Sequence, residues 1–218
     1  MKVNEAIPIL KAACRRPFGE LFTGHPVDLI TNKGHAGQLL LKYIGIGLDS
    51  NLTDFEDGEL KTNKAGVNGE PLETMFITQI SENIDTFIRP NPLPFDESNL
   101  YKKTKNLVYL PVVKNSESTA DWYFTDCIHI QINKGSKIYN KISDDYYAIC
   151  NGLNHHIKNS EDGFIHTTNG PNYVQVRSKD SKPYHPIYSA HYKRHISDKN
   201  HALYFMKTFM RDALSNQI

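Results

Sequence analysis

The sequence has few of the features that place a chain in a common functional class. None of its apolar runs is long enough to cross a bilayer, and its first residues contain no apolar segment of the signal-peptide kind. It has only three cysteines, Cys14, Cys127 and Cys150, which are widely spaced and form no CxxC pair. Free thiols in a reducing compartment fit this pattern better than a disulfide framework. We therefore expect a cytoplasmic protein with no membrane partner.

Motifs for several kinds of chemistry are also missing. The chain has no glycine-rich phosphate loop, no GxGxxG element and no nucleophile-elbow sequence that would support Ser/His/Asp hydrolysis. Its ten histidines, which include His155, His156, His185 and His201, match no zinc-binding spacing. We expect these histidines at the surface or near a bound nucleic acid rather than around a metal ion.

An excess of charge of one sign is absent overall, but charge is unevenly distributed. The net charge is only +1, which does not predict a nucleic-acid-binding protein. Residues 177–211 nevertheless contain eight lysines or arginines against two acids, Asp180 and Asp198. This segment is either a surface for a phosphate backbone or a solvated face. The aromatic and basic residues 184–194 within it suit a DNA contact and a packed loop equally.

The remaining composition is that of an ordinary globular protein. Hydrophobic residues make up 39% and charged residues 22% of the 218 residues, and no long linker separates independent domains. Hydrophobic spacing predicts helices at residues 3–16, 35–46, 137–153 and 200–214. Strands are predicted at residues 59–61, 72–80, 106–113 and 122–132, and a hairpin at 163–176 with residues 164–165 and 173–176 as its arms. We expect the 72–80 strand to pair back across a turn, and the 106–113 strand to lie beside the 59–61 strand.

The most informative stretch is NLTDFEDGELKTNK at residues 51–64. The two-residue period of a strand places Glu59 and Lys61 on one face and Leu60 on the other, in the core. Asp54, in the preceding turn, can then lie beside Glu59. Two carboxylates at one point suit Mg²⁺, and a lysine beside them can orient a water for hydrolysis of a phosphodiester. The alternative is a solvated strand edge that carries an ion pair.

Several motifs in their order resemble the MutH/Sau3AI family of GATC-specific endonucleases, which have the PD-(D/E)xK restriction-endonuclease fold. The similarity extends from about residue 33 to residue 214. It is carried by KGHAGQLL at 33–40, DF at 54–55, ELKT at 59–62, GEPLETMF at 69–76, KKTK at 102–105, LVYLPV at 107–112, YVQVRSK at 173–179 and Tyr204. The resemblance implies an α/β fold with a restriction-endonuclease-like mixed central sheet flanked by helices. It also implies a single domain, residues 1–218, with two lobes around a DNA-binding cleft.

The resemblance also implies roles for individual residues. Asp54 and Glu59 would hold Mg²⁺, Lys61 would be the catalytic lysine, and Lys103 would assist near the scissile phosphate. The implied DNA-binding residues are Lys33 on a backbone phosphate, Arg177 and Lys179 on a base-reading loop, Phe76 and Tyr204 near the target adenine, and Lys207. An arginine can bind guanine O6 and N7 with two hydrogen bonds. Without the resemblance, core packing is the plainer interpretation of Phe76 and Tyr204.

The chain departs from the family pattern in two places. Mismatch-repair members carry an additional glutamate on the second helix, and the matching residue here is Leu41. Four residues separate Asp54 from Glu59, where those members have six. Neither departure removes the Asp-Glu-Lys set, so we expect activity.

The expected function is that of a Mg²⁺-dependent type II restriction endonuclease that cleaves double-stranded DNA at a short palindrome, GATC, leaving a 5′ phosphate. The first alternative is the mismatch-repair nickase of the same family, which cuts hemimethylated GATC. The second is a non-cleaving DNA-binding effector domain of this fold. Expected partners are duplex DNA and a cognate DNA methyltransferase in the same system, with the enzyme a monomer or a DNA-induced dimer.

Overall fold

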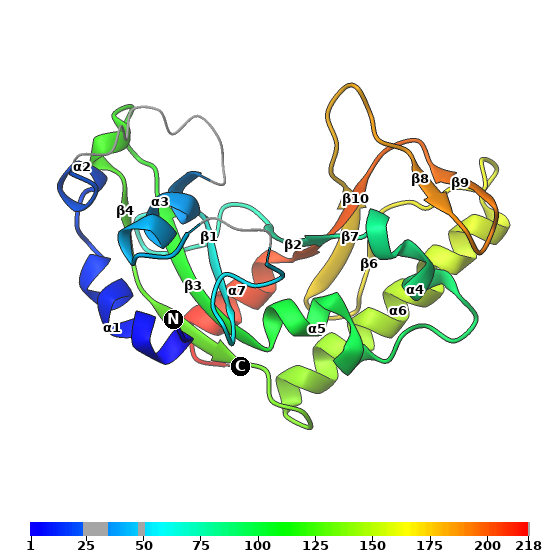
Figure 1. Ribbon diagram of the computed structural model, residues 1–218, viewed down its shortest axis with the longest axis horizontal. Coiled ribbons are helices and arrows are strands. Elements are labelled where there is room, and N and C mark those ends of the chain that lie inside the picture. The colour runs from blue at the N-terminus through cyan, green and yellow to red at the C-terminus, as the bar shows by residue number, and fades with distance from the viewer. Residues whose placement is uncertain (24–34, 48–50, 218) are drawn as a thin grey trace. The chain divides into compact units, whose positions relative to one another are not determined.

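The computed structural model describes residues 1–23, 35–47 and 51–217 (Figure 1). The chain divides into two compact units, and each unit collects segments that are far apart in the sequence. Unit 1 consists of Met1–Met75, Lys103–Ile132 and Met210–Ile218. Unit 2 consists of Phe76–Lys102 and Asn133–Phe209. The expected α/β class is confirmed, because helices accompany a mixed sheet in unit 1 and antiparallel sheets in unit 2.

Unit 1 is built on a mixed sheet around strand β3 (Asn106–Val113). β1 (Glu59–Ala65) runs parallel to β3, as a neighbour, which confirms the predicted pairing. β4 (Tyr123–Phe124) and β5 (Ile128–Gln131) both run antiparallel to β3, so the strand predicted at 122–132 is two short strands. From its second residue to its last, β3 is buried, as expected for an apolar strand with neighbours on both edges.

Helices of unit 1 supply the rest of its core. They are α1 (Val3–Ala13), α2 (Phe18–Leu21) and α3 (His35–Tyr43). Apolar residues at helical spacing on α1, from Val3 to Ala13, are buried against Leu60 of β1 and the β3 side chains in one cluster. The second predicted helix is confirmed, and it ends before Gly45, whose positive φ of 81° suits a glycine.

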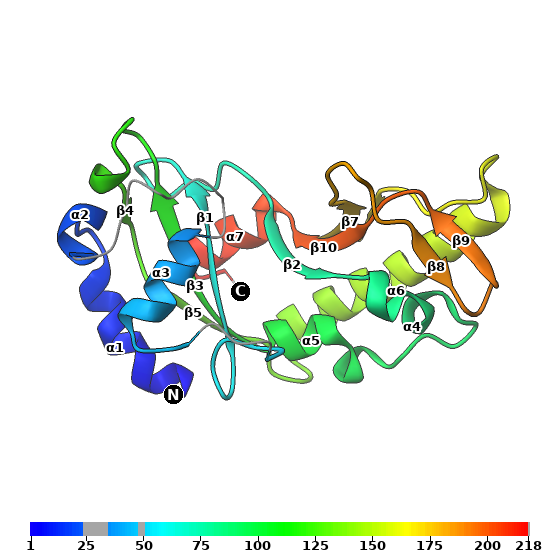
Figure 2. The same ribbon diagram turned by 45° about the horizontal axis from the view of Figure 1, so that its top comes forward.

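Unit 2 contains an antiparallel sheet in the order β2, β10, β7, β6. Its strands are β2 (Met75–Gln79), β10 (His201–Phe205), β7 (Val174–Ser178) and β6 (Thr168–Asn169). The long helix α6 (Lys137–Asn159) packs on β6 and β7 (Figure 2). The prediction of this helix is confirmed, and the helix continues six residues beyond the predicted end at residue 153.

A second hairpin and several short helices complete the described chain. The hairpin consists of β8 (Ile187–Ser189) and β9 (Arg194–Ser197), and its Ser189 Oγ donates to Asp85 Oδ1 at 2.5 Å. The α-helices are α4 (Ile84–Ile88), α5 (Asn99–Thr104) and α7 (Lys207–Leu214). The 3₁₀ turns are η2 (Ser81–Asn83), η3 (Phe95–Glu97) and η4 (Thr119–Asp121). Across the described ranges, no helix is long and apolar enough to cross a membrane.

Three local predictions are wrong in whole or in part. Residues 201–205 are a strand, and the last helix begins only at Lys207, because β10 pairs with both β2 and β7 and these ladders outweigh the helical spacing of its apolar residues. The strand predicted at 72–80 is the shorter β2, which pairs with β10. Only the residues before β2 pair back onto β1, through an isolated antiparallel bridge between Ala65 and Pro71 and a hydrogen bond of 3.0 Å from Leu72 N–H to Lys64 O. The hairpin at 163–176 exists, but its first arm is β6 rather than residues 164–165, since Ile165 N–H donates to Ile196 O instead.

Candidate active site and nucleic-acid-binding face

Glu59, Lys61 and Lys103 lie together at the beginning of β1. Lys61 Nζ is 2.5 Å from Glu59 Oε1, and Lys103 Nζ is 3.4 Å from the same oxygen. Leu60, between the first two, is buried in the core cluster. The predicted alternation along this strand is therefore confirmed, with both charged groups on the face opposite Leu60.

Asp54 joins this group from the turn that precedes β1. Its Oδ2 accepts a hydrogen bond from Leu60 N–H at 3.0 Å, which fixes the carboxylate beside the strand. Burial and then the negative charge of Glu59 raise the pKa of Asp54, while the Leu60 N–H, Lys61 and Lys103 oppose that rise. Two carboxyl and two amino groups thus share one partly buried site, which we call the acid–lysine cluster (Asp54, Glu59, Lys61, Lys103).

Glu59 is unusual because this acidic residue is 3% exposed and only one of its two carboxyl oxygens has hydrogen-bond partners among the described residues. Its Oε1 has both lysines, whereas its Oε2 is buried without a hydrogen-bond partner in the part of the chain that the structure describes. A buried acceptor without a partner is costly. A hard divalent cation suits such an oxygen, and Asp54 supplies a second carboxylate next to it. The donor set therefore fits Mg²⁺.

Among the described residues, no further side chain joins these two carboxylates as a metal ligand. Within residues 1–23, 35–47 and 51–217, no group of three His, Cys, Asp or Glu side chains is arranged to hold a metal ion. Mg²⁺ commonly keeps several waters and takes only one or two carboxylates plus phosphate oxygens, so two carboxylates suffice for it. Leu41, at the position of the extra family glutamate, is 7% exposed in the apolar core and supplies no oxygen.

The turn that carries Asp54 is held by residues that the sequence reasoning missed. Asp57 Oδ1 accepts from Val3 N–H at 2.8 Å, and Asn106 Nδ2 donates to Asp57 O at 2.9 Å. His129 Nε2 lies 2.7 Å from Asn106 Oδ1, behind that amide. Gly58 packs so closely that a Cβ there would lie 2.6 Å from Val3 Cγ2. Val3 and Asn106 each lie about fifty residues from Asp57 along the chain, so no local pattern indicates these contacts.

Asp54 also borders a pocket of about 610 Å³ in unit 1. The pocket is lined by Met1, residues 45–47, which follow α3, and residues 51–56. Its wall includes the ion pair between the Met1 amino group and Glu56 Oε1, at 2.6 Å. Asp54 is thus the member of the acid–lysine cluster that faces this open space.

In unit 2, four of the predicted DNA-binding residues form an aromatic–basic cluster (Phe76, Arg177, Lys179, Tyr204). The Phe76 and Tyr204 rings meet edge to face, with centroids 5.8 Å apart. Lys179 Nζ lies 3.7 Å from the Phe76 centroid, and Arg177 Cζ lies 5.6 Å from the Tyr204 centroid. The strand register explains the grouping, because Tyr204 pairs with Gln175 and every second residue of β7 shares its face.

This cluster is at the surface rather than in the core. Both rings are half-buried, and Arg177 and Lys179 are exposed. Burial raises the pKa of Tyr204, and the charge of Arg177 opposes that rise. Cations over ring faces form an arrangement that can stack on bases and contact phosphates at once.

The two other predicted DNA-binding residues lie elsewhere. Lys33 falls outside the described residues. Lys207 is half-buried as the first residue of α7, and none of the ring contacts in the described chain involves it. Tyr204 itself is on β10, three residues before α7 begins.

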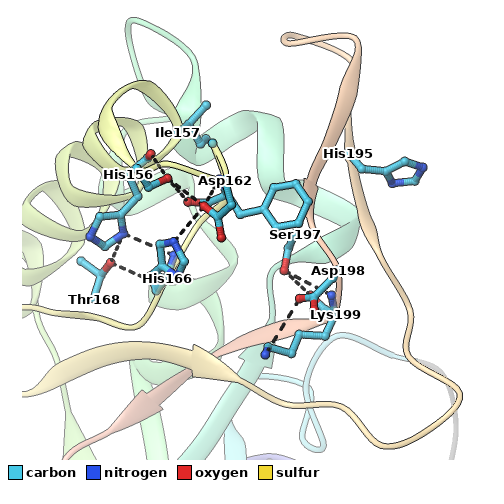
Figure 3. Close-up of polar contacts among 12 residues, drawn as sticks. His156, Ile157, Asp162, His166, Thr168, His195, Ser197, Asp198 and Lys199 are labelled. Carbon is cyan, nitrogen blue, oxygen red and sulfur yellow. Dashed lines mark hydrogen bonds and ion pairs between the residues drawn. The ribbon is translucent and has the colours of Figure 1, made fainter.

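Histidines gather at the end of α6, where their contacts serve the local fold (Figure 3). His156 Nδ1 accepts from the backbone N–H of His166 at 3.3 Å and lies 3.5 Å from Thr168 Oγ1. His166 Nε2 lies 3.1 Å from Asp162 Oδ1. Burial and then the neighbouring His166 lower the pKa of His156. These bonds attach the segment after α6 to the helix.

Comparison with known proteins does not assign a family. No protein-family model matches the chain, and no curated protein matches it. The resemblance to the MutH-like endonucleases therefore stays a prediction from the motifs.

Proposed function

We propose that the chain is a Mg²⁺-dependent type II restriction endonuclease that cleaves duplex DNA at a short palindrome, GATC, and leaves a 5′ phosphate. One observation carries the proposal. Glu59 is buried, holds two lysines on one carboxylate oxygen, and keeps the other oxygen unpartnered within the described chain, beside Asp54. The proposal includes the restriction-endonuclease-like fold that the motifs imply.

The residues of the acid–lysine cluster have separate tasks in this proposal. Mg²⁺, held by Asp54 and Glu59, would polarise the scissile phosphate and lower the pKa of a bound water. Lys61, fixed by Glu59, would orient the attacking water and stabilise the charge that develops on the phosphate oxygens. Lys103, on the same Glu59 oxygen, would attract the phosphate. The water oxygen would lose a proton to solvent and form a bond to phosphorus while the bond from phosphorus to the 3′ oxygen breaks, and the 3′ oxygen would take up a proton from solvent.

The aromatic–basic cluster supports binding of nucleic acid by unit 2. Arg177 is exposed and can offer two parallel donors to guanine O6 and N7. Lys179 can contact a phosphate, which would make the affinity fall with salt. The Phe76 and Tyr204 rings offer partly open surfaces for contact with a base.

The decisive experiment is digestion of unmethylated, hemimethylated and fully adenine-methylated plasmid by the purified chain with Mg²⁺. The proposal predicts discrete fragments that end at GATC in unmethylated DNA. Slow nicking of hemimethylated DNA would refute the restriction activity and favour the mismatch-repair nickase. Fragments that end at another sequence would retain the chemistry and refute the specificity. Binding without any cutting would favour a non-cleaving effector domain.

Glu59→Ala tests the site assignment, with Glu20→Gln as the control. Glu20 is an exposed glutamate in an ion pair with Arg16, so its loss changes only surface charge. We expect the Glu59 variant to lose cleavage and retain DNA binding, and the Glu20 variant to cut normally. Cleavage by Glu59→Ala at the normal rate would refute the assignment.

A further inference from the structure

The loop after β7 is held by one carboxylate, that of Asp180. Asp180 Oδ1 accepts from Ser181 N–H at 2.9 Å and His185 Nδ1 at 2.8 Å. Its Oδ2 accepts from His185 N–H at 2.6 Å and Asn200 N–H at 2.9 Å. The side chain is only 5% exposed, although every residue from Ser181 to His185 is exposed. Both oxygens are therefore saturated by donors.

This carboxylate fixes the shape of the loop. Because Ser181 and His185 bond the same side chain, residues 181–185 close into a ring, which we call the 181–185 loop. The bond from Asn200 attaches the ring to the residue before β10, and Lys179 N–H donates to Asn200 O at 2.9 Å beside it. The Asn200 and His185 backbone N–H groups hold the pKa of Asp180 well below its usual range, so the clamp persists at neutral pH.

The clamped loop carries groups suited to a DNA backbone. Lys182 is exposed within it, and Tyr184 is 46% exposed. The loop begins two residues after Lys179, so it continues directly from the aromatic–basic cluster. A lysine on a preformed loop loses less conformational entropy on binding than one on a mobile loop.

The position of Asp180 is otherwise difficult to explain. As a negative charge among eight lysines and arginines, it should weaken phosphate binding if charge alone mattered. Asp198, the other acid of the segment, is different: it is 60% exposed and its Oδ1 lies 3.9 Å from Lys199 Nζ (Figure 3). An acid that is nearly buried and saturated by hydrogen-bond donors acts through structure, whereas an exposed one acts through charge.

We propose that Asp180 is a positioning residue for DNA binding, which holds the 181–185 loop so that Lys182 and Tyr184 contact backbone phosphates of the duplex. The inference rests on the proposed function, because it takes duplex DNA as the partner of unit 2. It yields a prediction opposite in sign to that of simple electrostatics. Removal of the negative charge at Asp180 should weaken binding rather than strengthen it.

The test compares Asp180→Ala with Asp198→Ala in the full chain. Both substitutions remove one negative charge, so charge alone predicts equal or tighter binding for both. Binding to a fluorescent GATC duplex is measured by anisotropy with Ca²⁺ in place of Mg²⁺, over a series of salt concentrations. We expect Asp180→Ala to bind about tenfold more weakly. The slope of log affinity against log salt concentration should become shallower by about the amount that one phosphate contact contributes. Asp198→Ala should bind as tightly as the wild type or more tightly.

A second variant keeps the inference testable if Asp180→Ala misfolds. Lys182→Gln with Tyr184→Ala leaves the clamp intact and should weaken binding by a similar factor. Combined with Asp180→Ala, it should add little, since both changes remove the same contacts. Full additivity, or wild-type affinity in the Lys182/Tyr184 variant, would overturn the inference.

The two proposals fail in distinguishable ways. A wild-type chain that does not bind duplex DNA would overturn both the proposed function and this inference. A wild-type chain that binds and cuts, with Asp180→Ala binding as tightly as Asp198→Ala, would overturn the inference alone. Partial restoration of affinity by Asp180→Asn, which retains one acceptor oxygen, would support it.

Discussion

Asp145 offers a direct test of how the β7 strand is held in unit 2. It lies on α6, is 0% exposed, and faces the chain that enters β7. Its Oδ1 accepts from Asn172 N–H at 2.7 Å and Asn172 Nδ2 at 3.2 Å. Its Oδ2 accepts from Tyr173 N–H at 2.6 Å and Val174 N–H at 2.8 Å. A Cβ on Gly170 would lie 2.5 Å from Oδ1, so this turn closes tightly over the carboxylate.

The perturbation is Asp145→Asn, which preserves shape and removes one acceptor oxygen. Whichever way the amide turns, at least one buried backbone N–H then faces an NH₂ group and loses its acceptor. An unsatisfied buried donor costs about 1–3 kcal/mol. Burial raises the pKa of Asp145, because a charge is disfavoured in the buried site. The neutral asparagine avoids this desolvation, which offsets part of the loss from the unpaired N–H. We expect a net loss of about 2 kcal/mol for the asparagine, and about 3–5 kcal/mol for Asp145→Ala, which leaves every donor unpaired.

Urea unfolding, followed by circular dichroism and fluorescence, measures this loss. The neighbouring Asp144→Asn is the matched control, because Asp144 is exposed on the same helix and undergoes the same chemical change. Its effect should stay within about 0.5 kcal/mol. The reasoning fails if Asp145→Asn and Asp144→Asn unfold at the same urea concentration with equal slopes.

Three further predictions concern the acid–lysine cluster. Gly58→Ala should destabilise the chain by about 1–3 kcal/mol and slow cleavage, because the new Cβ would collide with Asn106 O. Gly47→Ala, whose Cβ would have no atom of the described residues within 4 Å, should do neither in the same urea and plasmid assays. Lys61→Gln should reduce the single-turnover cleavage rate by roughly a hundredfold and leave the duplex affinity unchanged. A hundredfold loss of duplex affinity would contradict the role of Lys61 in orienting the attacking water. Because burial and then Glu59 raise the pKa of Asp54 in the metal-free cluster, Mg²⁺ affinity should begin to fall on acidification at a higher pH than for an ordinary aspartate; an onset at or below about pH 3.9 would contradict this.

Local patterns were sufficient for the part of the site that lies on one strand. The alternation of Glu59, Leu60 and Lys61 depends only on the pleat, so the sequence correctly placed both charged groups opposite the core. The same holds for β3, whose apolar run predicts a buried strand. The grouping of Phe76 with Tyr204 came from the family motifs, and the observed ring contact agrees with that grouping. Their roles in DNA binding stay predictions.

Local sequence patterns did not indicate contacts between residues far apart in the chain. Residues 201–205 contain apolar residues that fit a helix, and only pairing with β2 and β7 makes them a strand. Asp180 gave no signal either, because one of its four donors comes from Asn200, twenty residues later. A single sequence does not show which distant backbone groups will meet a carboxylate, and these contacts decide whether an acid acts through charge or through structure.

The acid–lysine cluster illustrates how such contacts can prepare a site before its cation binds. Two carboxylates face two ammonium groups, so the cluster is formally neutral and can be partly buried without a large unpaired charge. Lys61 and Lys103 use one oxygen of Glu59, and Leu60 N–H uses one oxygen of Asp54, so neither carboxylate has to rotate to keep these partners. A divalent cation would therefore add its charge to an already ordered site. The cluster would become positive only at that point, and its attraction for a DNA phosphate would depend on the cation.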